Sequence, residues 1–253
     1  MLEGRQGVIF GVANKRSLAY ACAQAAARAG ARLVLTYQNE RFAEAVEQLA
    51  STLPDASVLE CDVASDASLD AAFERLGAAM PEVDFAIHSI AFAQREELEG
   101  RYVDTSREGY RVSQEISSYS FTAIARRLAV RMPRGGSLVT MTYLGGERVV
   151  PHYNVMGVAK AALEASVRYL AADLGPQGIR VNAVSAGAVR TLASGGISGF
   201  AQMLDIAKER SPLRRATDPA EVADATLFLL SDLSRGITGT TLYVDSGLHV
   251  MAV

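Results

Sequence analysis

Short apolar runs alternate with longer stretches of helical period along almost the whole chain, and this alternation limits the possible folds most. The predicted strands are Gly7–Val12, Arg32–Tyr37, Ser57–Cys61, Phe85–Ile90, Ser137–Thr142, Arg180–Val184 and Thr241–Val244. The predicted helices are Ser17–Ala29, Glu40–Ser51, Ser68–Ala79, Ser106–Arg131, Tyr153–Leu174 and Pro219–Ser231. Alternation of this kind implies right-handed crossovers between parallel strands, and strands that are apolar throughout are covered on both faces. We therefore predict one α/β domain over residues 1–253, a doubly wound parallel sheet of about seven strands with helices on both faces.

One long segment, Gly187–Arg210, departs from the alternation. It is rich in glycine and serine, and the apolar residues Ile197, Phe200 and Met203 are interspersed in it. A loop of this length in a compact domain is usually functional. We expect residues 187–210 to form a substrate-binding lid with an apolar lining.

Composition excludes several function classes. The net charge of −3 gives no electrostatic reason to expect nucleic acid or an anionic membrane as a partner. No run of about 18 apolar residues predicts a membrane span. The two cysteines, Cys22 and Cys61, do not have the spacing of metal ligands and lie in apolar surroundings. We expect buried free thiols, no metal site and a cytoplasmic location.

The turn after the first predicted strand has features of a phosphate site. Gly11 permits a tight turn and close backbone approach, and Ser17 can cap the helix that follows. The N–H groups of the first helical turn would then face a pyrophosphate. The segment lacks the G-x-G-x-x-G fingerprint, so an ordinary strand–helix turn is the alternative.

Two further strand ends suggest where the rest of a dinucleotide would bind. Gln38, after the second strand, can bind ribose hydroxyls without charge, and the nearest cation for a 2′-phosphate, Arg41, lies three residues on. This favours NADH over NADPH. Asp62, after the third strand, can accept from the adenine amino group, or it can serve only as a turn or capping residue.

Tyr153 and Lys160 lie seven residues apart at the start of a predicted helix. Seven residues are close to two helical turns, which would place the phenol and the ammonium on one face. A neighbouring cation lowers the pKa of a phenol and strengthens it as a hydrogen-bond donor to a developing oxyanion. The alternative is an accidental spacing of one packed and one solvated side chain.

The whole chain resembles a short-chain dehydrogenase/reductase, and within that group the NADH-dependent enoyl-[acyl-carrier-protein] reductases of bacterial fatty-acid synthesis. The segments that carry the resemblance are Gly11–Tyr20, Thr36–Asn39, Cys61–Ala64, His88–Ala93, Ile116–Phe121, Thr142–Lys160, Ile179–Thr191 and Gly236–Gly247. Ordinary members of the larger group have the Tyr and Lys four positions apart, whereas the enoyl reductases have them seven apart, as here. The place of the usual catalytic serine holds Thr140, and the enoyl reductases use an extra aromatic residue that matches Tyr143.

The resemblance implies a Rossmann-like fold and reduction of trans-2-enoyl thioesters by hydride transfer from NADH. It implies catalytic roles for Tyr143, Tyr153 and Lys160, although Tyr143 can also be a packing residue. The residues it implies for cofactor binding are Gly11, Ser17, Leu18, Gln38, Asp62, Val63, Ser89, Ile90, Lys160, Val189, Arg190, Thr191, Leu192 and Ala193. Those implied for substrate binding are Ala93, Tyr143, Tyr153, Met156, Ile197, Phe200 and Met203.

The resemblance also implies a homotetramer and acyl carrier protein as the partner that delivers the substrate. Two rival functions remain. A carbonyl or 3-oxoacyl reductase would use the same cofactor site, but the Tyr–Lys spacing and Tyr143 argue against it. A dinucleotide-sensing module without catalysis would be expected to lack Tyr153 or Lys160, and both are present.

Overall fold

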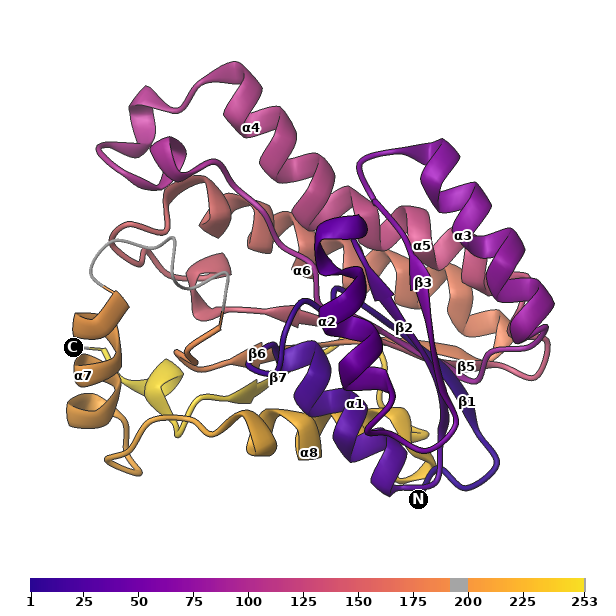
Figure 1. The fold of residues 1–253 in the computed structure, drawn as a ribbon. Coiled ribbons are helices and arrows are strands. Elements are labelled where there is room, and N and C mark those ends of the chain that lie inside the picture. The colour runs from indigo at the N-terminus through magenta and orange to yellow at the C-terminus, as the bar shows by residue number, and fades with distance from the viewer. Residues whose placement is uncertain (192–199, 253) are drawn as a thin grey trace.

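The computed structural model describes residues 1–191 and 200–252, and in these ranges one parallel sheet organises the chain (Figure 1). The strand order is β3-β2-β1-β4-β5-β6-β7, and every neighbouring pair is parallel. The strands are β1 (Gln6–Phe10), β2 (Arg32–Tyr37), β3 (Ala56–Glu60), β4 (Phe85–His88), β5 (Gly136–Thr142), β6 (Ile179–Ala186) and β7 (Thr241–Val244). The predicted doubly wound, seven-stranded fold is confirmed.

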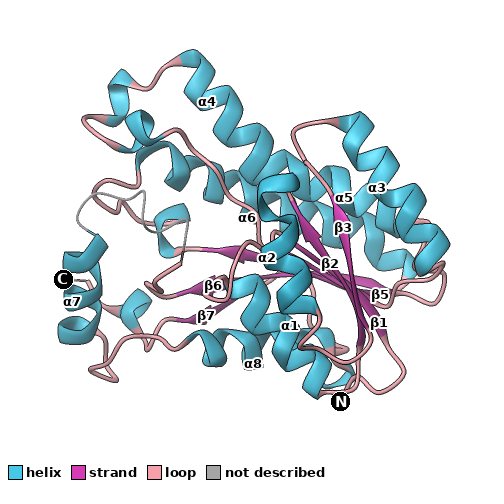
Figure 2. Cartoon of the chain, viewed as in Figure 1, coloured by secondary structure: helices cyan, strands magenta, loops and turns pink. Residues whose placement is uncertain are grey.

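Helices cover both faces of the sheet (Figure 2). One hydrophobic cluster joins the sheet to α1 (Leu18–Arg28), α2 (Glu40–Ala50) and α8 (Pro219–Leu230). A second cluster joins the other face to α3 (Asp66–Ala79), α5 (Ser120–Ala129) and α6 (Asn154–Leu174). The central strands are buried on both sides, which explains why they read as apolar runs rather than as an alternating pattern.

The strand order reverses at β1, which pairs with β2 on one side and with β4 on the other. Chain connections therefore run away from this point in both directions. In open α/β sheets, ligands bind in the crevice outside the carboxyl ends of the strands at such a switch point. The topology thus points to the carboxyl edge near β1 and β4 as the place to look for a site.

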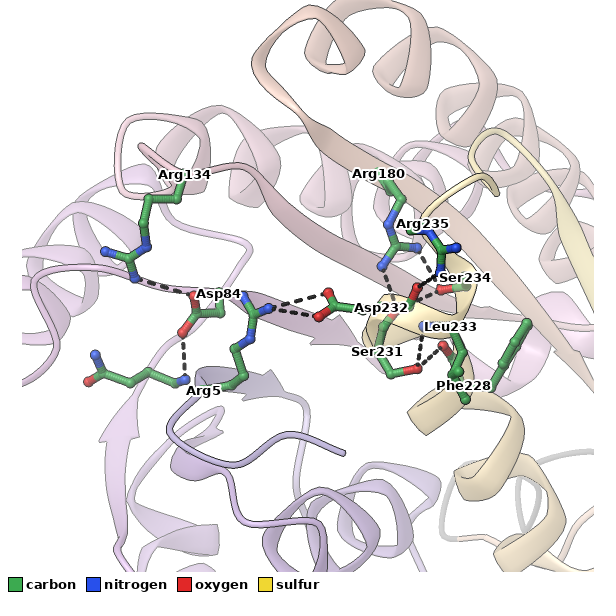
Figure 3. A network of polar contacts seen from close by, with 11 residues as sticks. Arg5, Asp84, Arg134, Arg180, Phe228, Ser231, Asp232, Leu233, Ser234 and Arg235 are labelled. Atoms are coloured by element: carbon green, nitrogen blue, oxygen red, sulfur yellow. Dashed lines mark hydrogen bonds and ion pairs between the residues drawn. The ribbon is translucent and has the colours of Figure 1, made fainter.

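The opposite, amino edge of the sheet is fastened by a polar network (Figure 3). Asp84, just before β4, has a nearly buried side chain and accepts from the Gln6 backbone N–H at 2.8 Å. Arg5 and Arg134 reach the same carboxylate at 3.4 Å, and Arg5 also pairs with Asp232 at 3.2 Å. The carboxylate is thus surrounded by donors from several segments, and we assign this network to structure rather than to chemistry.

Two helical features differ from the sequence prediction. The predicted helix Ser106–Arg131 consists of α4 (Arg107–Gln114), a π-helical turn (Glu115–Tyr119) and α5. Residues 200–210, predicted as part of a loop, form α7 (Phe200–Arg210). Buried Leu204 and Ala207, three residues apart on one face, give α7 a reason to fold. Because α7 is short and follows a glycine-rich stretch, its helical periodicity was not recognised in the sequence.

Candidate active site

Gly11 makes the turn at the end of β1, and its surroundings explain why no side chain fits there. Its φ is +92°, a region that favours glycine, and a Cβ atom would lie 2.4 Å from the Ser89 carbonyl oxygen and 2.9 Å from Ile90 Cγ1. Ser89 N–H in turn donates to the Phe10 carbonyl at 3.1 Å. The fold therefore brings three of the predicted cofactor-binding residues together at the switch point.

Ser17 caps α1, as the sequence predicted. Its hydroxyl accepts from Tyr20 N–H at 3.3 Å and donates to the Asn14 carbonyl at 2.7 Å. Leu18 is the first residue of the helix and is half-buried. The turn between Gly11 and Ser17 thus ends at a helix N-terminus whose field favours an anion.

The neighbouring strand ends carry the residues predicted for the adenosine half. Gln38 is exposed directly after β2. Val63 is buried beyond β3, and Asp62 accepts from Ala64 N–H at 3.1 Å, which makes it a turn residue. Its contact with adenine stays a prediction. Arg41 extends over the Phe42 ring, with its guanidinium carbon 5.9 Å from the ring centre.

Two tyrosines meet beyond the carboxyl end of β5. The rings of Tyr143 and Tyr153 lie edge to face with centroids 5.0 Å apart. Ala93 and Met156, both predicted for substrate binding, belong to the same hydrophobic cluster. Gly145 allows this packing, because a Cβ there would lie 2.3 Å from the Tyr153 ring. Four predicted substrate residues therefore form one cluster.

Lys160 projects from α6 toward the end of β5. Its side chain is buried, and Nζ donates to the Met141 carbonyl at 2.7 Å. Burial lowers its pKa from 10.5 to about 8, and Glu164 opposes that shift. The ammonium is thus held at a fixed place but is only marginally stable as a cation.

The electrostatic part of the Tyr–Lys prediction is wrong. Burial raises the pKa of Tyr153 above its usual value, with smaller contributions from Tyr143 and Glu164, and Lys160 does not reverse the effect. Tyr153 is the N-cap residue of α6, and Asn154 has a φ of 36°, so the pair is not separated by two regular turns. Burial likewise raises the pKa of Tyr143 to about 12. Both phenols stay protonated at neutral pH.

The third group of predicted residues follows β6. Val189 is buried, Arg190 is exposed and Thr191 is half-buried. Leu192, Ala193 and Ile197 lie outside the described residues. Met203 is half-buried on α7 and is not among the described members of the tyrosine cluster. Phe200 begins α7, where only its backbone is described.

Sequence reasoning missed a layer of buried polar residues that joins β4, β5 and α5. Ser120 Oγ donates to the Ile116 carbonyl at 2.6 Å, so it accepts from His88 Nε2, 2.8 Å away. Thr140 Oγ1 lies 2.8 Å from His88 Nδ1 and also donates to the His88 carbonyl at 3.3 Å. Burial lowers the pKa of His88 to about 3, which keeps the imidazole neutral. His88 and Thr140 are register partners on β4 and β5, so strand pairing was the signal that could have linked them.

The same layer continues to Glu164 on α6. Thr142 Oγ1 donates to Glu164 Oε1 at 2.5 Å.

Within the described part of the chain, neither a cluster of side chains suited to a metal ion nor a helix long and apolar enough to cross a membrane is found. The Gly11 turn lies at the switch point, and the tyrosine cluster and buried Lys160 lie at the end of β5. This is the arrangement expected of a dinucleotide-binding oxidoreductase.

Comparison with known proteins identifies the family. The profile described as Enoyl-(Acyl carrier protein) reductase matches residues 11–249. The enoyl-[acyl-carrier-protein] reductase [NADH] FabI of Bacillus subtilis (strain 168) is 53% identical over 253 residues, covering 99% of this chain and 98% of the relative. The [NADPH] FabI of Staphylococcus aureus (strain MRSA252) is 50% identical over 252 residues, covering 99% and 98%. A crystal structure of the Anaplasma phagocytophilum reductase in complex with NAD has a TM-score of 0.96 and 52% identity, covering 100% of this chain and 96% of that one.

The chain belongs to the enoyl-(acyl carrier protein) reductase family. The resemblance read from the sequence and the enzyme class that it implied are thereby confirmed. Relatives of nearly equal identity are named for NADH and for NADPH, so family membership alone does not fix the cofactor preference.

Proposed function

We propose that this protein reduces trans-2-enoyl thioesters carried by acyl carrier protein to saturated acyl thioesters, with NADH as the hydride donor, in fatty-acid elongation. The observation that carries the proposal is the packing of Tyr143 against Tyr153 at the carboxyl edge, where buried Lys160 also reaches the end of β5. An ordinary carbonyl reductase does not need the second tyrosine.

Bound NADH would supply hydride to Cβ of the substrate, and negative charge would then collect on the thioester oxygen. Tyr153 is the donor that we assign to this oxygen. Because burial keeps its phenol protonated, an O–H is available at neutral pH without competition from water. Tyr143 contacts the Tyr153 ring and fixes its orientation, and it also borders the substrate.

We assign Lys160 to the nicotinamide ribose hydroxyls, with Ser89 and Ile90 on the other side of that ribose. The Gly11 turn fits this cofactor because the missing side chain leaves its backbone open to close approach. The Ser17-capped helix then takes the pyrophosphate with Leu18, and Val189, Arg190, Thr191, Leu192 and Ala193 flank the pyrophosphate and carboxamide. Asp62 and Val63 take the adenine end.

The preference for NADH rests on Gln38. An exposed, uncharged amide can bind ribose hydroxyls but cannot neutralise a 2′-phosphate. Comparison of kcat/KM for NADH and NADPH tests this assignment, and equal values or an advantage for NADPH would contradict it.

The acyl chain is assigned to the cluster that contains Ala93 and Met156, extended by Ile197, Phe200 and Met203 from residues 187–210. We propose that this segment closes over the bound cofactor and substrate. Hydrogen exchange with and without NAD⁺ and a substrate-like inhibitor tests closure, which predicts added protection across the segment. Unchanged protection would contradict it.

We also propose a homotetramer and a cytoplasmic location. The buried free thiols Cys22 and Cys61 suit a reducing compartment, and burial raises the pKa of both to about 12, which makes them unreactive. Exposed apolar side chains such as Tyr169 on α6 and Leu233 after α8 offer surface for contacts between copies. Light scattering that gives a stable monomer at micromolar concentration would contradict the tetramer.

The decisive test of the reaction compares an enoyl thioester with a 3-oxoacyl thioester under the same conditions, by following the loss of NADH absorbance. We expect turnover of the enoyl substrate and little of the 3-oxoacyl substrate. The reverse result would favour the rival carbonyl chemistry.

A further inference from the structure

Glu164 is a buried carboxylate close to the catalytic lysine, and the reaction itself gives it no task. It lies one helical turn after Lys160 on α6, so both side chains face the end of β5. Only 6% of its surface is exposed. A buried carboxylate is costly to keep and needs compensation.

The contacts of Glu164 hold its carboxylate beside the lysine. Lys160 Nζ donates to the carbonyl of Met141 at 2.7 Å, and the hydroxyl of the next residue, Thr142, donates to Glu164 Oε1 at 2.5 Å. Consecutive residues of one strand thus anchor the cation and the anion. Gly146 closes the other side, because a Cβ there would lie 2.8 Å from the same carboxylate oxygen.

The two charges act through space rather than by direct contact, since no salt bridge among the described residues joins them. Burial drives both groups toward their neutral forms: it lowers the pKa of Lys160 and raises that of Glu164. Each charge opposes the shift of the other. The negative charge of Glu164 favours the ammonium form of Lys160, whereas burial favours the neutral amine.

Other titratable groups around the pair do not replace Glu164. Glu147, after the turn that packs on α6, is exposed and raises the pKa of Glu164, whereas Arg168 on α6 lowers it. His88 on β4 is neutral, and Tyr243 on β7 and the N-cap Tyr153 are protonated phenols.

We propose that Glu164 is a positioning residue that keeps Lys160 protonated, so that the reductase binds NADH at neutral pH. The proposal rests on the assignment of Lys160 to the cofactor. It adds a counter-charge that acts only through that lysine.

The test measures the dissociation constant for NADH by fluorescence, from about pH 6 to about pH 10, in the parent and four variants. In the parent, binding weakens as Lys160 loses its proton near pH 8. Glu164→Gln keeps an acceptor for Thr142 but removes the charge, and we expect the alkaline loss of binding to begin about one pH unit lower or more. Glu164→Asp restores the charge and should recover most of the shift.

Glu74→Gln is the matched control, because it removes the same charge from an exposed position on α3. Its pH profile should match that of the parent. Lys160→Ala tests the cofactor role of Lys160 separately from the effect of Glu164 on that lysine. If Lys160→Ala binds NADH as the parent does, the role of Lys160 is wrong.

If Lys160→Ala binds weakly at every pH while Glu164→Gln follows the profile of the parent, the proposal for Glu164 alone is overturned. A uniform loss of affinity in Glu164→Gln without a shift along the pH axis would also overturn it, because that result indicates only a packing defect.

Discussion

Replacing Lys160 by methionine should stabilise the cofactor-free protein while it removes the assigned cofactor contact. Burial lowers the pKa of Lys160 from 10.5 to about 8, and at neutral pH this corresponds to a cost of about 3 kcal/mol for holding the ammonium inside the fold. Methionine has a similar length and no charge, but it loses the hydrogen bond to the Met141 carbonyl, worth about 1 kcal/mol. The expected net gain in the free energy of unfolding is about 2 kcal/mol.

The pH dependence gives the sharper test. Folded Lys160 releases its proton near pH 8, whereas in the unfolded chain it does so near 10.5, so the unfolded chain binds more protons between these values. The free energy of unfolding of the parent therefore rises with pH in this window, and the advantage of Lys160→Met shrinks. Urea denaturation at fixed protein concentration, at neutral pH and near pH 10, measures both differences.

Lys208→Met, on the exposed side of α7, is the control and should change the free energy of unfolding by less than about 0.5 kcal/mol at either pH. If Lys160→Met is no more stable than the parent at neutral pH, or if its advantage grows with pH, then burial of the Lys160 ammonium does not destabilise the fold as we infer.

Three further predictions concern the reaction. Gln38→Arg should move the ratio of kcat/KM toward NADPH, because a guanidinium can bind a 2′-phosphate. An unchanged ratio would mean that the phosphate is bound elsewhere. Tyr153→Phe should bind NADH almost normally but lose turnover by about 10²-fold, as steady-state kinetics would show. Gly145→Ala should displace the Tyr153 ring, which a Cβ would approach at 2.3 Å, and lower kcat by up to about 10²-fold with little change in NADH affinity. A full kcat in that variant would show that the ring has room to move.

The fold was predictable because strands that are buried on both faces are apolar along their whole length, which is easy to recognise in the sequence. The strands Arg32–Tyr37 and Thr241–Val244 were predicted with the bounds that the structure shows, and the others differ by a few residues at their ends. Local periodicity was weaker where tertiary contacts decide the conformation. The π-helical turn Glu115–Tyr119 contains Ser117, whose hydroxyl donates to the Phe92 carbonyl at 3.0 Å and accepts from the Phe92 N–H at 2.9 Å. Such a distant contact has no local signal.

The site was predictable as a set of residue positions but not as an electrostatic environment. The spacing singled out Tyr153 and Lys160, and the fold brings both to the same edge of the sheet, while their catalytic roles stay a prediction. The expected effect of one on the other was wrong because depth of burial, which no spacing encodes, dominates both pKa values.

If Tyr153 is the donor that we propose, its strength as a donor comes from exclusion of water rather than from an acidic phenol. A nearby cation would add to the stabilisation that a protonated Tyr153 gives an oxyanion, and burial works against that cation. Exclusion of water at this edge of the sheet therefore favours the protonated tyrosine but disfavours the charged lysine. Glu164 adds negative charge near the lysine and so favours its charged form. Thr142 supplies the hydrogen bond that the buried Glu164 carboxylate needs.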